Sequence, residues 1–506
     1  MFDVRSKISL IFLLLFVALT AAAENLHQPM GCRRGTPRSA TTLRRAQYPG
    51  YHCGGDFYKG TRHQLVVFAS FQDRQFQGDE TATIAQWEKI FNTKNLSEKP
   101  FYGSVHDYFY AQSYGQFDVI FDLKYVQVDS CKKYRSTKED DENSQYLVDD
   151  ALDVLLTRDI DWSLYDWNGD GYINQVIFVY AGKGSFYGGF SNAEADKNSI
   201  WPHQWRLSEH LDLTTPDTKD HRDARPFEKD GKTYTVDTYC AVQEIGTNGG
   251  YDSFGTICHE YTHCFGFPDF YVDKTKYVGQ WDLMDYGNMN DKGYCPAGYS
   301  AHERWLMGWL EPIELKEPVT ITGIPALSEE GKAYLIRNDD YPSEYYIVEN
   351  RQPTGFDAKL PGSGVIVFHI DYDESLWASY DLNAIVNSNT KRHYVIIPAN
   401  DSYKESGWAY PYYDNDCLTD TSEPAAQLWH ERSNGTKLMS KPLFNIAVDS
   451  DGLASFDFMD DASAIHHVER PSAVSQKWYD LLGRQLSDRP QKKGIYIVEG
   501  RKVVVK

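Results

Sequence analysis

Basic side chains are scarce in this chain. Lysine and arginine together number 51, against 72 aspartates and glutamates, and the formal net charge is −21 at pH 7. A protein that binds nucleic acid needs a surplus of cations to neutralise phosphates, so the shortage argues against a nucleic-acid partner. The acidic balance instead favours solubility and the binding of divalent cations.

Long apolar runs are missing beyond the N-terminal residues. Arg5 and Lys7 precede an apolar run over residues 8–19, and small residues follow it at 20–23. This order predicts an export signal peptide over residues 1–23. The run is shorter than the roughly 20 apolar residues that a membrane-spanning helix needs, which makes an uncleaved anchor the weaker interpretation. We expect a secreted or cell-surface protein with no transmembrane segment after cleavage.

Cysteines are few for the length of the chain. The eight cysteines are widely spread, and although an oxidising compartment permits disulfides, their spacing does not reveal which of them pair. Cys258 and Cys264 would be separated by about 9 Å of helix rise, which is too far for a disulfide between them. We expect these two thiols to pair elsewhere or to stay reduced.

Apolar and aromatic residues are abundant enough for a packed protein. They make up 41% and 14% of the chain, and the 36 tyrosines favour extended strands over helical bundles. A length of 506 residues is too great for one ordinary core and predicts two or three domains. Residues 24–60, which include the basic and apolar-poor stretch 33–45, are expected to form a pro-segment or a linker.

The most informative stretch is CHEYTHCFGFPDFY, from Cys258 to Tyr271. At about 100° per residue, His259 and His263 lie about 40° apart around a helix, so that both imidazoles project from one face and one zinc ion can sit between them. Apolar residues at helical spacing on another side predict a stripe that packs against the core. The alternative is that the two histidines are ordinary core residues with satisfied hydrogen bonds.

The residues after the second histidine predict a sharp turn. Gly266 ends the helix and Pro268 prevents it from resuming, so the chain turns back and brings Asp269 towards the metal. Together with Glu260, which follows the first histidine, these residues complete the pattern HExxHxxGxxD. The full pattern favours a metal site over a pair of core histidines.

This segment resembles the metzincin class of zinc peptidases, in the variant of the M6 (immune inhibitor A-like) family, whose motif ends in Pro-Asp where other metzincins place a third histidine. The resemblance extends over about residues 60–460. Four further segments carry it: the first core strand at 62–73, an early helix and strand at 102–119, the Met-turn at 279–290 and the closing helix of the catalytic domain at 301–312.

The chemistry of the residues agrees with this resemblance. His259, His263 and Asp269 give Zn²⁺ three protein ligands and leave a fourth position for water, which is the open arrangement that catalysis needs. Glu260 can take a proton from this water as it attacks a peptide carbonyl and then deliver the proton to the leaving amine. Glu260 is therefore the expected general base and acid.

Two more residues follow from the resemblance. Met284 is similar to the methionine of the Met-turn, an apolar floor beneath the metal and not a ligand. Tyr286 stands where related metzincins carry a tyrosine that can reach the zinc or the oxyanion, and a phenol there could donate a hydrogen bond in the transition state. The alternative for Tyr286 is simple packing.

A second metal site is indicated by DWNGDGYIN, residues 166–174. Oxygen ligands at alternate positions and a glycine that permits the sharp turn are typical of the front of a calcium loop. The twelfth position is Ile177 instead of glutamate, so the loop is not an EF-hand, and the following QVIFVYAG predicts a buried strand. A plain turn with solvated carboxylates is the alternative. The candidate calcium ligands are Asp166, Asn168, Asp170, Tyr172 and Asn174.

After residue 312 the sequence pattern changes to short segments that predict β-strands. Alternating strands at 344–374 and a hairpin at 444–458 resemble the β-rich segment that follows the M6 catalytic domain. His369 and Asp371 within it are expected to be packed and hydrogen-bonded, not a second metal site. The last residues, 479–506, resemble a short C-terminal sorting tail of the type IX secretion system, with a plain terminal hairpin as the alternative.

These observations predict an α+β protein with a metzincin-like zinc peptidase domain, a β-rich domain and a short β tail. The expected boundaries are 1–23 for the signal peptide, 24–60 for the pro-segment or linker, 61–312 for the M6-like domain, 313–461 for the β-rich domain and 462–506 for the sorting-tail-like segment. The expected function is that of a secreted zinc endopeptidase that acts on proteins or peptides, with calcium as a second cofactor and the type IX machinery as a partner. A non-catalytic binding or adhesion protein that keeps this fold is one alternative, and a hydrolase of glycoprotein or cell-wall peptide is another.

Overall fold

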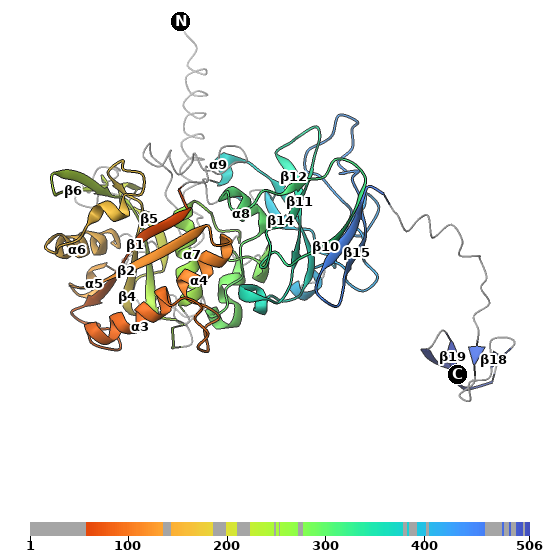
Figure 1. Cartoon of the computed structure of the whole chain (residues 1–506), viewed down its shortest axis with the longest axis horizontal. Coiled ribbons are helices and arrows are strands. Elements are labelled where there is room, and N and C mark those ends of the chain that lie inside the picture. Colours follow the sequence, from red (N-terminus) through yellow and green to blue (C-terminus); the bar gives the residue numbers. More distant parts are fainter. Residues whose placement is uncertain are drawn as a thin grey trace, which may run out of the picture.

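The computed structural model describes residues 57–134, 143–185, 199–209, 223–246, 249–251, 253–271, 277–377, 382–383, 392–400, 404–460, 478–479, 485–486, 492–498 and 501–505. The expected signal peptide and nearly all of the expected pro-segment or linker lie outside these residues, as does much of 462–506. The described elements form a mixed α/β protein (Figure 1).

The first part of the chain is built on a five-stranded sheet with the order β2-β1-β4-β8-β5. Four of these strands run parallel, and the edge strand β5 runs antiparallel to β8. Strands of a parallel sheet read as nearly continuous apolar runs because both of their faces are covered. The expected strands at 62–73 and after residue 174 are therefore present as β1 and β4. The strands span Gly60–Phe71 (β1), Phe117–Val128 (β2), Val176–Lys183 (β4), His203–Arg206 (β5) and Thr238–Ile245 (β8).

Helices cover this sheet and place the histidine motif beside it. The helices α3 and α4 pack against β2, α7 packs against β8 and β5, and α4 also contacts α7 (Figure 1). A capping box starts α4, in which Ser104 and Asp107 each accept a hydrogen bond from the other's backbone N–H. The helices span Glu80–Asn92 (α3), Val105–Gln112 (α4), Cys131–Tyr134 (α5), Gln145–Leu156 (α6), Phe254–Phe265 (α7), Ala301–Leu306 (α8) and Glu374–Trp377 (α9).

Shorter elements connect the sheet to its surroundings. A small three-stranded sheet has the order β3-β7-β6, with strands Tyr172–Ile173 (β3), Arg225–Lys229 (β6) and Lys232–Val236 (β7). The 3₁₀ helices span Trp162–Tyr165 (η2), Leu207–Glu209 (η3), Gly279–Trp281 (η4), Tyr286–Gly293 (η5), Gly355–Lys359 (η6) and Glu405–Gly407 (η7). None of the helices in the described parts of the chain has the length and apolar character needed to cross a membrane.

A second five-stranded sheet, of order β14-β13-β12-β11-β9, follows the helix α8. A three-stranded sheet of order β10-β16-β15 completes this part and contains the hairpin expected at 444–458. The strands span Ile313–Glu314 (β9), Val319–Ile324 (β10), Ala333–Arg337 (β11), Glu344–Arg351 (β12), Gly364–Asp371 (β13), Tyr394–Ile396 (β14), Leu443–Val448 (β15) and Ala454–Phe458 (β16).

The central strands of the second sheet are shared between two cores. Along β12, Tyr345 and Ile347 belong to the core of the first part of the chain, whereas Tyr346 and Val348 belong to a smaller core with the three-stranded sheet. The same alternation continues on β13, because successive strand residues point to opposite faces. The β-rich part therefore packs directly against the part that carries the histidine motif.

The C-terminal residues form a sheet of their own. Four antiparallel strands have the order β18-β17-β19-β20, and β18, β19 and β20 agree with the short strands expected within residues 479–506. They span Trp478–Tyr479 (β17), Gln485–Leu486 (β18), Gly494–Val498 (β19) and Arg501–Val505 (β20).

Candidate active site

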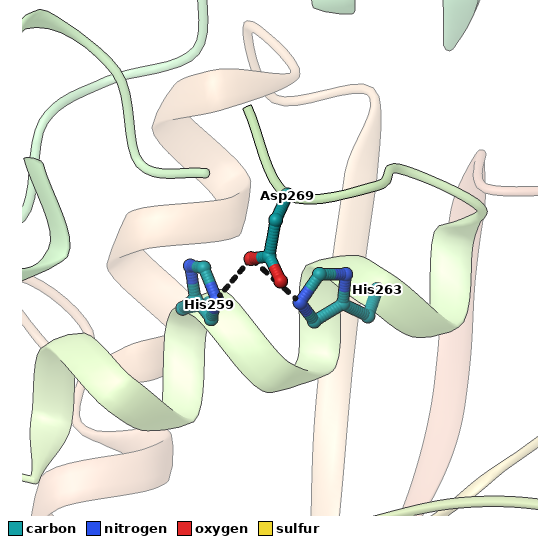
Figure 2. A group of neighbouring side chains, drawn as sticks. All are labelled: His259, His263 and Asp269. Atoms are coloured by element: carbon teal, nitrogen blue, oxygen red, sulfur yellow. Dashed lines mark ion pairs between the residues drawn. The ribbon is translucent and has the colours of Figure 1, made fainter. Parts of the chain in front are cut away.

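His259, His263 and Asp269 converge on one point inside the protein (Figure 2). Asp269 Oδ1 lies 3.1 Å from His259 Nε2 and 3.4 Å from His263 Nε2. Candidate ligand atoms of the three residues all lie within 4.8 Å of one another, and no other such group of histidine, cysteine or acidic side chains occurs in the described residues. The three residues predicted as metal ligands are thus brought together.

Helix geometry and a glycine turn produce this convergence. The two histidines lie one turn apart on α7, and their ring centroids are 4.7 Å apart. The helix ends at Phe265, and Gly266 adopts the left-handed conformation with φ 109°, which L side chains rarely adopt. The chain turns back there and carries Asp269 to the histidines, as the sequence predicts. Ser253 precedes the helix, but its hydroxyl donates to the carbonyl oxygen of Glu244 instead of capping the helix.

Backbone carbonyls orient both imidazoles. His259 Nδ1 lies 2.9 Å from the carbonyl oxygen of Leu283, and His263 Nδ1 lies 2.7 Å from that of Phe267. A carbonyl oxygen can only accept a hydrogen bond, so each Nδ1 carries the proton and donates it. Each Nε2 therefore faces Asp269, in the arrangement in which neutral histidines bind metals.

The site fits a metal cation by a second criterion. His263 Nε2 and Asp269 Oδ1 are buried, and neither atom makes a hydrogen bond within the described part of the chain. Buried polar atoms are almost always satisfied by a partner, so this pair calls for an additional group between them. A zinc ion with two imidazole ligands and one carboxylate ligand is such a group.

The electrostatics of the three side chains also favour a cation. Burial by itself lowers the pKa of His259, but the carboxylates of Asp269 and Glu260 outweigh burial and raise this pKa to about 9. Burial raises the pKa of Asp269, yet the two histidines overcome it and lower that pKa. The carboxylates of Asp269 and Glu260 thus favour a positive charge at this site, whether it is a proton on His259 or a bound cation.

Glu260 lies beside the first imidazole. Its residue is 1% exposed, and its charge contributes to the raised pKa of His259. The position next to His259 on α7 follows from the helix, and the burial keeps bulk water away from the carboxylate. A buried carboxylate near the metal ligands is suited to accept a proton.

A turn formed by residues 282–287, called here the 282–287 turn, lies against the ligands. Leu283 supplies the acceptor for His259, and the backbone N–H of Phe270 donates to the carbonyl oxygen of Met284 at 2.9 Å. Met284 is fully buried. Met284 thus packs against the segment that carries Asp269, and its role as an apolar floor beneath a metal stays a prediction.

The position of the Tyr286 side chain relative to the two histidines and Asp269 is indicated by one ring contact. Its side chain is half-buried, and its ring lies 5.9 Å from the ring of Tyr271, which follows Asp269 by two residues. This contact puts Tyr286 beside the chain segment that carries the third ligand. A role of its phenol in the reaction stays a prediction.

The candidate calcium residues form a hydrogen-bonded loop that includes β3 and ends just before β4. Asp166 Oδ2 accepts a hydrogen bond from Gly171 N at 3.0 Å, and Asp170 accepts bonds from Tyr172 N and from Asn168 Nδ2. Asn174 Oδ1 accepts a bond from the backbone N–H of Trp167 at 2.7 Å. Asp166 Oδ1 is buried and has no hydrogen-bond partner among the described residues. The loop is thus preformed, and calcium in it stays a prediction.

His369 and Asp371 belong to polar clusters, as expected. His369 Nε2 lies 2.8 Å from Glu344 Oε1, and its ring stacks on Trp429 at 5.2 Å. Asp371 accepts hydrogen bonds from His430. Both side chains are therefore packed and hydrogen-bonded.

Sequence reasoning missed the groups that hold the ligands in place. The carbonyl oxygens of Leu283 and Phe267 orient the histidines, and no side-chain motif reports a backbone acceptor. Asn383 and Tyr394, which lie far along the chain, also contact the segments around the ligands. A local signal is present in GQWDLMDYG, whose two aspartates, Asp282 and Asp285, both accept backbone hydrogen bonds at the 282–287 turn.

Among known proteins, no curated sequence matches this chain. One family model does match, that of the immune inhibitor A peptidase M6 catalytic domain, over residues 88–307. The matched residues begin within α3, include the whole of α7 with both histidines and Glu260, and extend through Asp269 and the 282–287 turn to the end of α8. Residues 88–307 are therefore similar to the catalytic domain of the immune inhibitor A (M6) peptidases, which indicates a metallopeptidase.

Proposed function

We propose that this protein is a secreted zinc endopeptidase that hydrolyses peptide bonds of extracellular proteins. The observation that carries the proposal is the convergence of His259, His263 and Asp269 around one point, with both Nε2 atoms turned towards the carboxylate. The similarity to M6 catalytic domains supports the same reaction class. The apolar run of the first residues supports export.

His259, His263 and Asp269 would hold the zinc ion. When bound, zinc polarises a water molecule and the scissile carbonyl, which makes water an effective nucleophile near neutral pH. The Nδ1 hydrogen bonds to Leu283 and Phe267 keep the two rings oriented for this role. The carboxylate of Asp269 balances part of the charge of the cation in a site from which bulk water is largely excluded.

Glu260 is the proposed general base. It accepts a proton from the attacking water and returns the proton to the amine that leaves when the peptide bond breaks. Tyr286 is proposed to donate a hydrogen bond to the carbonyl oxygen of the substrate as negative charge develops there. The proximity of Tyr286 to Tyr271 supports this role, since Tyr271 lies two residues beyond the third ligand.

A digest of an unbiased peptide library by the mature protein tests this proposal. Cleavage that stops in the presence of a zinc chelator and returns with added zinc is the expected result. Glu260→Ala is the matched control, because it keeps the three ligands and lacks the base. Measured zinc in the parent without cleavage of any peptide or denatured protein would support the second candidate, a binding or adhesion protein with a structural zinc.

We also propose that a calcium ion braces the 166–174 loop. Asp166 Oδ1 is buried without a hydrogen bond, and the backbone N–H of Gly171 already closes the loop onto Asp166 Oδ2. A cation between the loop oxygens would satisfy the remaining acceptor. We expect a calcium chelator, with zinc replenished, to lower the melting temperature of the parent.

The variant Asp166→Ala should remove most of this calcium-dependent stabilisation. Asp159→Ala, at an exposed aspartate outside the loop, is the control and should keep it. A melting temperature that does not respond to calcium in any of the three proteins would reject the site and leave a plain turn.

The type IX secretion machinery is the proposed export partner. Residues 479–506 resemble its sorting tails, and the described residues of the segment 462–506 form the sheet of β17, β18, β19 and β20. In a host that has this machinery, a protein that lacks residues 462–506 should then stay in the periplasm and not cross the outer membrane. Unchanged export of the shortened chain would make the tail a plain terminal sheet.

A further inference from the structure

Asn383 holds the residue that follows the third ligand. Its Nδ2 donates to the carbonyl oxygens of Phe270 and Tyr394, each at 2.9 Å, and its Oδ1 accepts from the backbone N–H groups of His393 and Tyr394, each at 3.0 Å. The side chain is fully buried, and these four bonds use both of its donors and both acceptor lone pairs. Phe270 comes directly after Asp269 and is thereby fixed to the β-rich part of the chain.

Phe270 is held from the other side by the 282–287 turn. Its backbone N–H donates to the carbonyl oxygen of Met284 at 2.9 Å, while its carbonyl oxygen accepts from Asn383. Its ring lies 4.2 Å from the ring of Tyr394. The backbone N–H, the carbonyl oxygen and the ring of Phe270 are thus all held, which restricts the movement of Asp269 next to it.

Tyr394, on β14, reaches the turn that orients the first ligand. Its hydroxyl donates to Asp282 Oδ2 at 3.1 Å and lies 2.7 Å from Ser300 Oγ. Asp282 Oδ1 in turn accepts from the backbone N–H of Met284 at 2.8 Å. Asp282 directly precedes Leu283, whose carbonyl oxygen orients His259. A chain of three hydrogen bonds therefore links the β-rich part to an imidazole of the metal site.

The carboxyl group of Asp282 is buried, and burial of a carboxyl group costs free energy unless hydrogen-bond donors surround it. Burial raises the pKa of Asp282 to about 6, and burial together with the charge of Asp282 raises that of the neighbouring Glu303. Each carboxyl needs nearby donors to stay buried in one orientation. Tyr394 supplies one such donor to Asp282 from outside the segment similar to M6 catalytic domains.

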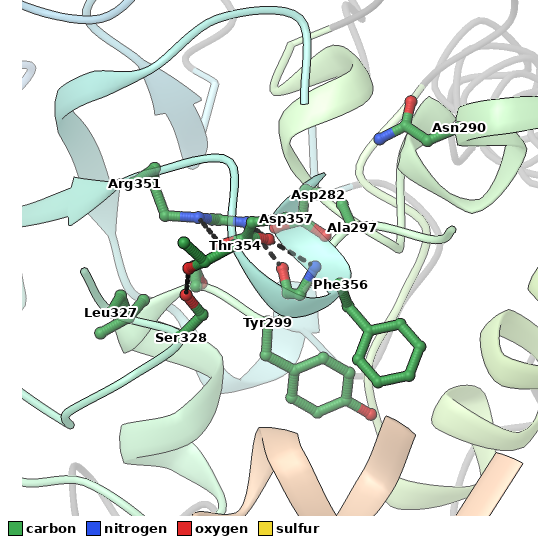
Figure 3. Close-up of polar contacts among 12 residues, drawn as sticks. Asp282, Asn290, Ala297, Tyr299, Leu327, Ser328, Arg351, Thr354, Phe356 and Asp357 are labelled. Atoms are coloured by element: carbon green, nitrogen blue, oxygen red, sulfur yellow. Dashed lines mark hydrogen bonds and ion pairs between the residues drawn. The ribbon is translucent and has the colours of Figure 1, made fainter. Parts of the chain in front are cut away.

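A buried ion pair fixes the interface in which Tyr394 lies. Arg351, at the end of β12, donates to both carboxylate oxygens of Asp357 at 2.8 and 2.7 Å (Figure 3). Its Nη2 also donates to the carbonyl oxygen of Gly298, and Asp357 accepts from Gly298 N, both at 3.0 Å. The segment that leads to Ser300 is thus tied to the second sheet independently of Tyr394, so removal of one hydroxyl leaves the interface in place.

We propose that Asn383 and Tyr394 are positioning residues of the zinc site, so that the β-rich part completes the metal centre instead of serving as a separate accessory. The inference rests on the proposed function. Asn383 fixes the backbone next to Asp269, and Tyr394 fixes the turn that carries the acceptor for His259. Groups that orient metal ligands commonly change metal affinity by 10- to 100-fold when they are removed.

Two pairs of matched variants test this inference. Tyr394→Phe removes one hydroxyl, and its control is Tyr346→Phe, whose hydroxyl donates to the carbonyl oxygen of Gln427 on the other face of the same sheet. Asn383→Asp removes the two donors, and its control is Asn350→Asp. Asn350 is a buried asparagine whose Nδ2 donates to two carbonyl oxygens, each at 2.8 Å, away from the site.

The readouts are the zinc dissociation constant from competition with a chelator, the visible absorption spectrum of the cobalt-substituted protein and the melting temperature of the metal-free form. We expect Tyr394→Phe and Asn383→Asp to weaken zinc binding by roughly 10- to 100-fold and to change the cobalt spectrum. The two controls should lower the melting temperature by similar amounts and keep the zinc affinity and the spectrum of the parent.

Zinc affinities and cobalt spectra of all four variants equal to those of the parent would overturn the inference while leaving the proposed function intact. A parent that binds no zinc would overturn the proposed function together with it. If Asn383→Asp does not fold, Tyr394→Phe decides alone, because the loss of a single hydroxyl leaves the ring on Phe270 and the ion pair of Arg351 in place.

Discussion

The carbonyl oxygen of Asn288 lies so close to Gly255 that a Cβ on this glycine would approach it to 2.0 Å. Gly255 occupies the first turn of α7, and Asn288 lies in η5, just beyond the 282–287 turn. The absence of a side chain therefore allows the helix with both histidines to approach the segment that follows the turn orienting them.

A glycine-to-alanine change in a helix normally stabilises it by up to about 1 kcal/mol. We expect the opposite for Gly255→Ala, a destabilisation of about 1–3 kcal/mol with weaker zinc binding, since the methyl group must push α7 away from a backbone oxygen. Thr256→Ala, at the next and partly exposed position, is the control for helix propensity alone. Chemical unfolding and zinc competition measure both effects, and a Gly255→Ala protein as stable as the parent would contradict the close approach.

Removal of the proposed base should separate metal binding from turnover. Glu260→Ala keeps all three ligands and is expected to retain zinc while its turnover falls by roughly 10²- to 10⁴-fold, because no other group takes the proton of the attacking water. Zinc content by mass spectrometry and cleavage of a fluorogenic peptide give the two measurements. A variant that cleaves like the parent would refute the assignment of Glu260.

The third ligand can be tested by exchange as well as by removal. Asp269→Ala leaves two imidazoles and should lose zinc on dialysis, whereas Asp269→His supplies a third imidazole, which is an accepted zinc ligand, and should retain part of the metal. Full zinc occupancy in Asp269→Ala would show that another group completes the site.

Tyr286 offers a test that distinguishes chemistry from packing. If its phenol stabilises the oxyanion, Tyr286→Phe should lower kcat by about 10²-fold and leave KM almost unchanged, because the hydrogen bond forms mainly in the transition state. The ring contact with Tyr271 would persist in the phenylalanine variant. A variant as fast as the parent would return Tyr286 to a packing role.

The start of α4 should give the protein an acid-sensitive element. Burial raises the pKa of Asp107, but His106 and the backbone N–H groups of Ser104, Asn95 and Leu96 outweigh it and lower this pKa to about 2. A folded-state pKa below the unfolded value of about 3.8 adds stability above that value, on the order of 2 kcal/mol, which is lost as the pH falls through about 2.

We therefore expect the difference in unfolding free energy between the parent and Asp107→Asn to be largest above pH 4 and to shrink towards pH 2. Urea unfolding at several pH values measures this difference. A difference that stays constant over this range would show that the hydrogen bonds of Asp107 do not depend on its charge.

The convergence of His259, His263 and Asp269 could be predicted because its geometry is local. His259 and His263 share a helical face at their spacing, and Gly266 with Pro268 forces the turn that returns Asp269, so a few consecutive residues determine the site. The strand β1 could be predicted for a similar reason, since an apolar run without breaks indicates a buried parallel strand.

The supports of the site could not be predicted in this way. The acceptors for the two imidazoles are the main-chain carbonyls of Leu283 and Phe267, and every residue has a carbonyl. Asn383 and Tyr394 reach Phe270 and Asp282 only through the packing of the second sheet on the first part of the chain. Such long-range pairings follow from tertiary structure, which the pattern of residues in a single sequence does not reveal.

The second sheet, whose two faces belong to two cores, affects when the core around α7 can form during synthesis. Ribosomes make α7 and its histidines well before β12 and β13, yet Ile347 and Phe368 on these strands fill the same core as α7. A nascent chain that has reached only α8 therefore exposes an unfinished apolar surface and lacks Tyr394 beside Asp282. The core that surrounds α7 can therefore be completed only after most of the polypeptide has emerged.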